Sequence, residues 1–534
     1  MAAADKKTTY TAAEVAVLED TIQNQQNQIQ AQQEQIDSLK RKLDHMNEVF
    51  ANAQRARFGQ SSEKTSYVLS EDQICLFNEA EKEQDHKAVE PTEDTFTVKA
   101  HARKKKRTLD EMTANLPEKE ILLELPESQL ICDKCGGKLK AIGKKFVRRE
   151  MQVIPRQVKI LAYYTVTYAC DHCEKDTGFA HIVSAKPPIP LMKHSLASPS
   201  SVADIMAKKY ADGLPLARQE KIWAREGVEL SRATMANWVI RCAQDYLFPV
   251  IAHMQMELLS RDILHCDETP IQVLKEEGKK PQTKSYMWLY RSGNDQKPPI
   301  VLYDYQPSRN GDHAATYLKD FKGYVHSDGY SGYNKLSGIT RVGCWAHLRR
   351  KFVEAIPAKK SDGPPTSAEL GRQYCDKLFA IEDSLKNLSD EERKIKRLEL
   401  EKPVLEAFWC WLESLNTLKG SALGKAVTYA LNQRPYMENY LLDGRCAISN
   451  NIAENAIRPF TVGRKNWLFA DTPKGATSSA AIYSLIETAK ANGLNVYAYL
   501  EHLLLYMPGS EWQRYPEELD NLMPWSPEVQ ENCK

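Results

Sequence analysis

Apolar residues recur every seven positions along residues 11–57. One seam reads Val15, Ile22, Ile29, Ile36, Leu43 and Phe50, and the companion seam reads Leu18, Gln25, Gln32, Leu39 and Met46. Thr11, with Glu14 three residues later, forms a capping-box pattern that starts a helix. This repeat predicts a parallel two-stranded coiled coil in which the buried glutamines fix the register. A single amphipathic helix packed on its own domain is the alternative interpretation.

The periodicity is lost over residues 58–124, which we interpret as a linker. The segment RFGQSSEK is followed by an acidic stretch and then by a basic run, which contains Arg103, Lys104, Lys105, Lys106 and Arg107. Such a run is usually a solvated segment. Beside DNA it would neutralise phosphates without reading sequence.

Residues 125–190 contain two CxxC pairs, Cys132 with Cys135 and Cys170 with Cys173. Each pair can point two thiolates at one tetrahedral zinc, and Val, Ile, Tyr and Thr in residues 157–168 favour strands. The segment therefore predicts a zinc ribbon with one structural Zn²⁺. A redox dithiol is the alternative, and His172 and His181 are possible substitute ligands.

Residues 191–260 show a helical pattern that resembles a helix-turn-helix. A helix over residues 219–226 should end at Gly227, and Ser231 should cap a second helix that runs through Trp238. DNA binding is one interpretation. Ordinary packing within an α-helical domain is the other, since the geometry alone is not specific.

From residue 261 the pattern changes to short apolar, β-rich runs: ILHCDETPIQVL, SYMWLY and PIVLYDY. A helix at residues 313–321 and a strand at residues 324–326 should follow. This order predicts a mixed sheet covered by helices, so the chain as a whole is a multidomain α+β protein.

Composition limits the function classes. A chain of 534 residues exceeds one hydrophobic core, and its formal net charge of +1 argues neither for nor against nucleic acid. No apolar run long enough for a membrane span and no secretory signal is evident, so we expect a cytoplasmic protein. In that compartment the 12 cysteines are expected to be thiols or metal ligands rather than disulfides.

Three acids are candidates for metal chemistry. Asp267 should follow the first strand and Asp328 the fourth, which places both at strand ends near the centre of one sheet. Glu454 lies in SNNIAENAIRPF, where it should share a helical face with Asn451. Converging carboxylates supply the hard oxygen ligands that Mg²⁺ prefers. Taken singly, each of the chain's 71 acidic residues is more often a surface residue, so only the combined context selects these three.

That context resembles a known family. RFGQSSEK, the CxxC pairs, KKYADGLPLARQE, HCDETP, HSDGYSGYN, CWAHLRRKF, NNIAENAIRPF, GRKNWLF and YSLIETAKANGL occur in order along nearly the whole chain. In the identity and order of these motifs, the sequence is similar to the bacterial insertion-sequence-66 transposases. That family is a branch of the DDE transposases with an RNase H-like catalytic core. The resemblance implies that Asp267, Asp328 and Glu454 are the catalytic triad and hold two Mg²⁺ or Mn²⁺ ions per active site.

The resemblance also implies a division of the remaining chain. The RNase H-like α/β core would comprise residues 261–353 and 446–508, separated by a helical insertion, residues 354–445, and followed by a tail, residues 509–534. The 126 positions between the second and third acids (454 minus 328) fit this scheme.

Other residues acquire expected roles from the same resemblance. Cys344 and His347 match a Cys-x-x-His element, for which we favour structural support of the core over a second zinc site. Arg464 and Lys465 are expected to hold phosphates. Trp467 either stacks on an exposed base or belongs to the core. Ser449 and Asn455 stand where many relatives have Asp and Arg, so neighbouring polar contacts can differ.

The sequence thus predicts a DNA transposase that cuts element ends and joins them to target DNA by two-metal phosphoryl transfer. A zinc-containing dimeric DNA-binding regulator without catalysis, or a metal-dependent DNA nuclease, are the alternatives. Expected partners are element-end and target DNA, a second copy of the chain in a homodimer or higher oligomer, and small accessory proteins of the same element. We expect nucleoid association when the protein is active.

Overall fold

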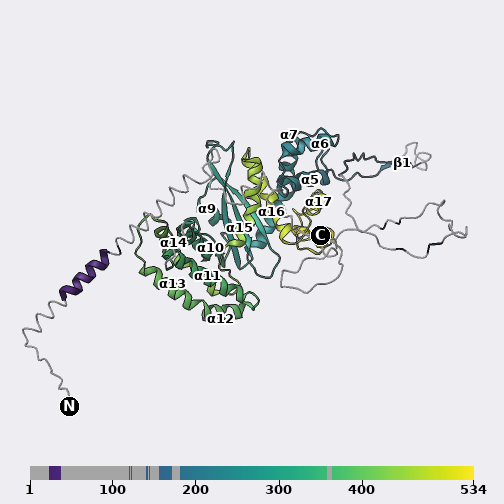
Figure 1. The fold of residues 1–534 in the computed structure, drawn as a ribbon. Coiled ribbons are helices and arrows are strands. Elements are labelled where there is room, and N and C mark those ends of the chain that lie inside the picture. Colours follow the sequence, from purple (N-terminus) through teal and green to yellow (C-terminus); the bar gives the residue numbers. More distant parts are fainter. Residues whose placement is uncertain are drawn as a thin grey trace, which may run out of the picture. The chain divides into compact units, whose positions relative to one another are not determined.

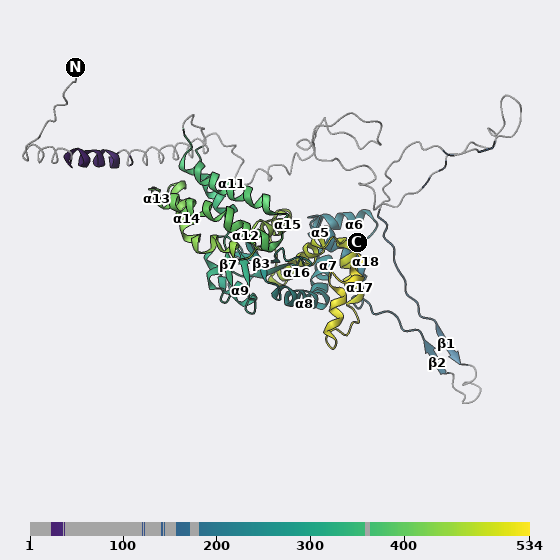
Figure 2. The same cartoon turned by 90° about the horizontal axis from the view of Figure 1, so that it is seen from below.

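The computed structural model describes residues 23–35, 37, 120, 122, 140, 141, 144, 156–170, 181–357 and 364–534 (Figures 1 and 2). They belong to two units, one of residues 1–58 and 157–534 and one of residues 59–156. Residues 23–35 and 37 are helical, as the heptads predict. The basic run at 103–107 and Cys132, Cys135 and Cys173 lie outside the described residues.

A short antiparallel hairpin is described within the predicted zinc ribbon. Strand β1 (Thr167–Cys170) pairs with β2 (His181–Ser184), and the hydroxyls of Thr167 and Ser184 lie 2.9 Å apart. Residues 157–166 have no regular secondary structure, so the strand expected over 157–168 is wrong except at its end. The sequence KPPIP after β2 explains this, because proline has no N–H with which to extend the ladder.

A group of helices precedes the sheet. Helix α5 (Pro199–Tyr210) is followed by α6 (Leu216–Arg225) and α7 (Arg232–Cys242). The φ angle of Gly227 is 86°, which favours glycine, and the Ser231 side chain accepts a hydrogen bond from the backbone N–H of Thr234. The predicted pair of helices around a glycine turn is therefore confirmed. A π-helix, η3 (Ala243–Leu247), and α8 (Phe248–Leu259) lead to the sheet.

The sheet has five strands in the order β5-β4-β3-β6-β7. Their bounds are β3 (Ile263–Gln272), β4 (Lys284–Ser292), β5 (Val301–Gln306), β6 (Tyr324–His326) and β7 (Thr340–Val342), with α9 (Gly311–Tyr317) between β5 and β6. Strands β3, β4 and β5 are antiparallel neighbours, whereas β3, β6 and β7 run parallel. The predicted mixed sheet is confirmed.

One expectation about the first acid is wrong. Asp267 lies inside β3 and does not follow it, because β3 continues to Gln272 as a long hairpin with β4. Pairing of β3 with β6 nevertheless stops at His265. Asp267 is therefore just beyond the parallel part of the sheet, and this keeps it at the edge where β6 ends.

The outer edge of β5 is covered by helix α16 (Pro473–Ala491). The hydroxyl of Ser484 accepts a hydrogen bond from the backbone N–H of Tyr303, and the hydroxyl of Thr488 accepts one from Val301. These contacts satisfy strand groups that would otherwise be unpaired. Helix α15 (Asn451–Trp467) packs on β3 and β4, and α17 (Val496–Tyr506) packs on α5. Helices η6 (Pro516–Leu522) and α18 (Pro527–Asn532) complete the chain.

The segment between β7 and α15 is helical, as predicted. Helix α10 (Trp345–Ala355) is followed by α11 (Ser367–Leu385), α12 (Asp390–Leu400), α13 (Lys402–Ser414), α14 (Ala422–Met437) and η5 (Asn439–Leu442). Its own core includes Trp345, Phe352, Phe408 and Trp409. Figure 1 shows α11–α14 grouped beside α10. No helix in the described part of the chain is long and apolar enough to cross a membrane.

Candidate active site

Asp267 and Asp328 are brought together by the parallel pairing of β3 with β6. His265 is opposite His326, and each acid follows its histidine by two positions. The two imidazole rings stack with their centroids 4.1 Å apart. Because alternate residues of an extended chain share a face, both carboxylates belong to the same side of the sheet.

The pKa of Asp267 responds to burial and to the acids around it. Burial holds the pKa of Asp267 well above its ordinary value, and the charges of Glu268, Asp328 and Glu454 raise it further. Only the backbone N–H of Glu268, 2.9 Å from Asp267 Oδ1, acts in the opposite direction. The charge of Glu454 therefore acts on Asp267, although Glu454 is distant from it in sequence.

Glu268 is a neighbour that sequence reasoning did not select, and its contacts separate it from the other acids. Its Oε1 accepts a hydrogen bond from Arg309 Nε at 2.8 Å, and its Oε2 accepts one from the Tyr333 hydroxyl at 2.6 Å. Burial raises the pKa of Glu268, while the tyrosine and arginine contacts lower it. Both oxygens already have partners, so Glu268 orders this side of the site.

Glu454 lies in the first turn of α15 and meets two side chains of α10. His347 Nδ1 is 3.4 Å from Glu454 Oε1, and an Arg350 guanidinium nitrogen is 3.1 Å from Oε2. The Nδ1 and Oε1 atoms are buried and have no hydrogen-bond partner among the described residues. The Cys-x-x-His element therefore lies beside Glu454, a closeness that was not predicted, with Cys344 at the N-cap of α10.

Asn450 connects the elements that carry these residues, and it was missed from the sequence. It occupies the N-cap position of α15, yet its side chain makes no capping bond. Its amide nitrogen donates to the Cys266 carbonyl at 2.8 Å, its Oδ1 is 2.9 Å from His265 Nδ1, and its backbone N–H donates to Cys344 Sγ at 3.1 Å. Asn450 is 1% exposed. Sequence analysis selected Asn451 instead, which is exposed.

The loop of Asp328 is held by Arg341 from β7. The Arg341 guanidinium donates to the Asp328 carbonyl and, at 2.9 Å, to the Ser327 hydroxyl. Its face lies 4.4 Å from the centroid of the Tyr436 ring. A buried, always-charged side chain with this many acceptors fixes the backbone on which the second acid stands.

The residues predicted to contact DNA from GRKNWLF lie at the end of α15. Arg464 donates to the Thr269 hydroxyl at 3.2 Å, two positions after Asp267, and burial followed by the charge of Arg464 lowers the pKa of Lys465. Trp467 is half-buried, with Lys209 Nζ 4.1 Å from its ring centroid and Tyr210 edge-on at 6.2 Å. The ring therefore packs partly against the core and is partly exposed.

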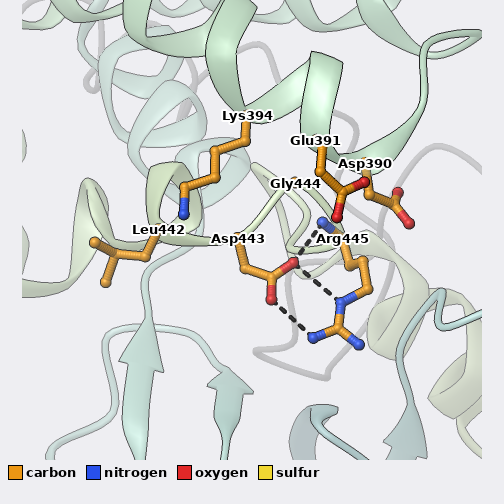
Figure 3. A pocket seen from close by; sticks show the side chains of 7 residues that line it. All are labelled: Asp390, Glu391, Lys394, Leu442, Asp443, Gly444 and Arg445. Atoms are coloured by element: carbon orange, nitrogen blue, oxygen red, sulfur yellow. Dashed lines mark hydrogen bonds and ion pairs between the residues drawn. The ribbon is translucent and has the colours of Figure 1, made fainter.

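A cavity of about 310 Å³ lies elsewhere, between the start of α12 and the segment after η5 (Figure 3). Asp443 and Arg445 in its wall pair with each other at 2.8 Å, and Arg445 also pairs with Asp262 at 2.7 Å. None of the residues predicted for the site lines this cavity, so it is separate from the acid cluster.

The acid cluster suits a hard divalent cation. Burial first, and then the charges of neighbouring carboxylates, raise the pKa of Asp267, and a bound cation would offset both effects. Among the described residues, Glu454 Oε1 has no hydrogen-bond partner that a cation would have to displace. A site of this kind, beside cationic side chains, belongs to the class of metal-dependent enzymes that act on phosphate esters.

Comparison with known proteins identifies the family. The model described as "Transposase IS66 family" matches residues 194–478, and "IS66 C-terminal element" matches residues 484–525. The "zinc-finger binding domain of transposase IS66" matches residues 129–174, and "Transposase C of IS166 homeodomain" matches residues 45–121. The chain belongs to the IS66 family of transposases, which are DDE-type enzymes with DNA as their partner.

Relatives of similar length occur in Sinorhizobium fredii (strain NBRC 101917 / NGR234). The uncharacterized protein y4qI is 29% identical over 510 residues, covering 90% of this chain and 88% of the relative. The uncharacterized protein y4hP is 28% identical over 492 residues, covering 88% of this chain and 86% of the relative. Both alignments extend over most of each protein. The DDE family uses divalent metal ions, and a zinc-finger domain is present.

Proposed function

We propose that Asp267, Asp328 and Glu454 are the catalytic triad of this insertion-sequence transposase and that they hold two Mg²⁺ or Mn²⁺ ions. The observation that carries the proposal is the pairing of His265 with His326 between β3 and β6, because each of the first two acids follows its histidine by two positions. The effect of Glu454 on the pKa of Asp267 supports the third. Glu268 is not included, because Arg309 and Tyr333 occupy its oxygens.

An RNase H-like core accounts for this arrangement. Three antiparallel strands followed by two parallel ones, in the order β5-β4-β3-β6-β7, support it, as does a helix that carries the last acid across the central strand. In the proposed scheme residues 261–353 and 446–508 form the core, residues 354–445 the insertion and residues 509–534 the tail.

The chain's own residues would bind and orient DNA for two successive displacements. When bound, the metal pair activates the attacking oxygen and stabilises the leaving one. Arg464 and Lys465 would hold backbone phosphates, and the contact of Arg464 with Thr269, two positions after Asp267, supports this role. Water is the first nucleophile, which frees a 3'-hydroxyl at the element end. That hydroxyl then attacks a target phosphodiester, so each step breaks one P–O bond and forms another.

The remaining modules would serve recognition and assembly. We assign DNA contacts to the α6–α7 pair, to Trp467 and to Arg103, Lys104, Lys105, Lys106 and Arg107. Cys132, Cys135, Cys170 and Cys173 would hold one structural Zn²⁺. A coiled coil over residues 11–57 would join two copies of the chain, and small accessory proteins of the same element would complete the assembly. Cys344 and His347 would support the core.

A joining assay with pre-cut element ends tests this proposal. Asp267→Asn, Asp328→Asn and Glu454→Gln keep side-chain volume and remove charge, so each should abolish cutting and joining while leaving DNA binding intact. Asp304→Asn is the matched control. Asp304 is on β5 of the same sheet, and burial raises its pKa to about 6 without contact to the triad. Joining by Glu454→Gln at the control rate would remove Glu454 from the triad.

A further inference from the structure

A cluster of three different metal-ligand types lies beside the acid site. Cys344 Sγ, one ring nitrogen of His347 and one carboxylate oxygen of Glu454 all lie within 4.8 Å of one another. Cys344 at the N-cap of α10 and His347 in its first turn face the same end of the helix. Glu454 approaches from α15.

The spacing of two of these atoms matches a shared ion better than a hydrogen bond. His347 Nδ1 and Glu454 Oε1 are 3.4 Å apart, and neither atom has a hydrogen-bond partner in the described part of the chain. Two ligands bound at about 2.0–2.1 Å to one tetrahedral zinc are themselves about 3.3–3.4 Å apart. A thiolate bound at about 2.3 Å would then lie about 3.6 Å from each, inside the observed limit.

We propose that Cys344, His347 and Glu454 bind a thiophilic divalent ion, Zn²⁺ or Cd²⁺, and that occupation of this site withdraws Glu454 from the catalytic magnesium site. Sulfur and imidazole ligands select such ions, whereas Mg²⁺ requires oxygen ligands. The two classes of ion therefore share only Glu454. The inhibitory half of the proposal rests on Glu454 being the third catalytic acid.

The surroundings of the sulfur support metal binding. The backbone N–H of Asn450 donates to Cys344 Sγ at 3.1 Å, and the start of α10 adds further N–H groups beside it. Burial raises the pKa of the Cys344 thiol to about 11, and these donors oppose that rise, so they favour the thiolate that a metal would bind. Binding would transfer the thiol proton to solvent as the metal–sulfur bond forms. Arg350 stays on Glu454 Oε2, so the ion would take Oε1 without breaking that pair.

Cadmium titration tests the site in the full-length protein, supplied beforehand with one equivalent of Zn²⁺ for the proposed zinc finger. Thiolate-to-cadmium absorption should show an additional Cd²⁺ in the wild type that is lost in Cys344→Ser, in which the serine hydroxyl can still accept the Asn450 N–H. Cys410→Ser, at an exposed cysteine on α13, is the matched control and should bind as the wild type does. His347→Gln should weaken this Cd²⁺ at least tenfold. Identical titrations of all four proteins would overturn the site.

Strand transfer at fixed Mg²⁺ then tests the consequence. Wild type and Cys410→Ser should lose activity at the same Cd²⁺ concentration, and excess Mg²⁺ should restore it. Cys344→Ser, compared with its own activity without cadmium, should need at least tenfold more Cd²⁺. Cys344-dependent binding without inhibition would overturn the withdrawal of Glu454. If Glu454 is not a catalytic acid, Glu454→Gln will join DNA normally in the absence of cadmium. This separate assay distinguishes failure of the proposed triad from failure of the metal site.

Discussion

Replacing Asn450 by alanine should separate the elements that carry the acids. The change deletes two buried hydrogen bonds, to the Cys266 carbonyl at 2.8 Å and to His265 Nδ1 at 2.9 Å. Each leaves a buried polar partner unsatisfied at a cost of about 1–3 kcal/mol, so we expect a total of roughly 2–6 kcal/mol. At about 2 °C per kcal/mol for a domain of this size, the melting temperature should fall by roughly 4–12 °C.

The same change should weaken Mn²⁺ binding, because Asn450 ties β3 to the start of α15 and so sets Asp267 relative to Glu454. Binding of Mn²⁺ to the DNA-free protein can be followed by electron paramagnetic resonance, beside thermal melting. Asn451→Ala is the matched control: the neighbouring side chain is exposed, and its loss should cost less than about 0.5 kcal/mol. Equal melting and equal Mn²⁺ affinity in the two variants would refute the reasoning.

Three further predictions concern other parts of the chain. Burial, together with the charge of Glu382, raises the pKa of Glu401 from 4.5 to about 8. Between pH 4.5 and about 8 the folded state therefore binds more protons than the unfolded state, and the free energy of unfolding should fall as pH rises through this range. Glu401→Gln should remove that fall in melting experiments, and unchanged pH dependence would contradict it. In metal analysis of the full chain, a Cys132→Ser/Cys170→Ser double variant should hold about one zinc fewer than the wild type; an undiminished zinc content would exclude these ligands. Ile29→Asp with Ile36→Asp should lower the solution mass by placing charge in the coiled-coil seam, whereas an unaltered mass would argue against that contact.

Periodicity predicted the sheet because each strand of the core is a short apolar run bounded by turn residues. It did not predict how far β3 extends, since strand length depends on the partner, and β4 pairs with it through Gln272. Before the hairpin β1–β2 the sequence predicted a strand that does not form. Residues 157–166 have a composition that favours a strand, but the segment opposite them is KPPIP, whose prolines cannot extend the ladder. The local amino-acid composition indicates where a strand can form, and the neighbouring strand determines where it begins and ends.

The site shows the same division between local and tertiary information. The three acids were selected by motif context, and the register of β3 with β6 explains why the first two meet. The role of Asn450 could not be predicted, because an asparagine before a helix is ordinarily expected to cap it. Here the side chain faces β3 instead, since Cys266 and His265 offer buried partners. Likewise, Glu454 lies close to the Cys-x-x-His pair only because α15 contacts α10 in the folded chain.

The most direct test of the account is strand transfer by Glu454→Gln on pre-cut element ends with Mg²⁺, measured beside wild type and Asp304→Asn at equal DNA occupancy. Glu454 is separated from Asp328 by the entire helical insertion, so its assignment depends most on the fold. We predict normal joining by wild type and by Asp304→Asn and none by Glu454→Gln, with DNA affinity equal in all three. Joining by Glu454→Gln at the wild-type rate would contradict the proposed active site.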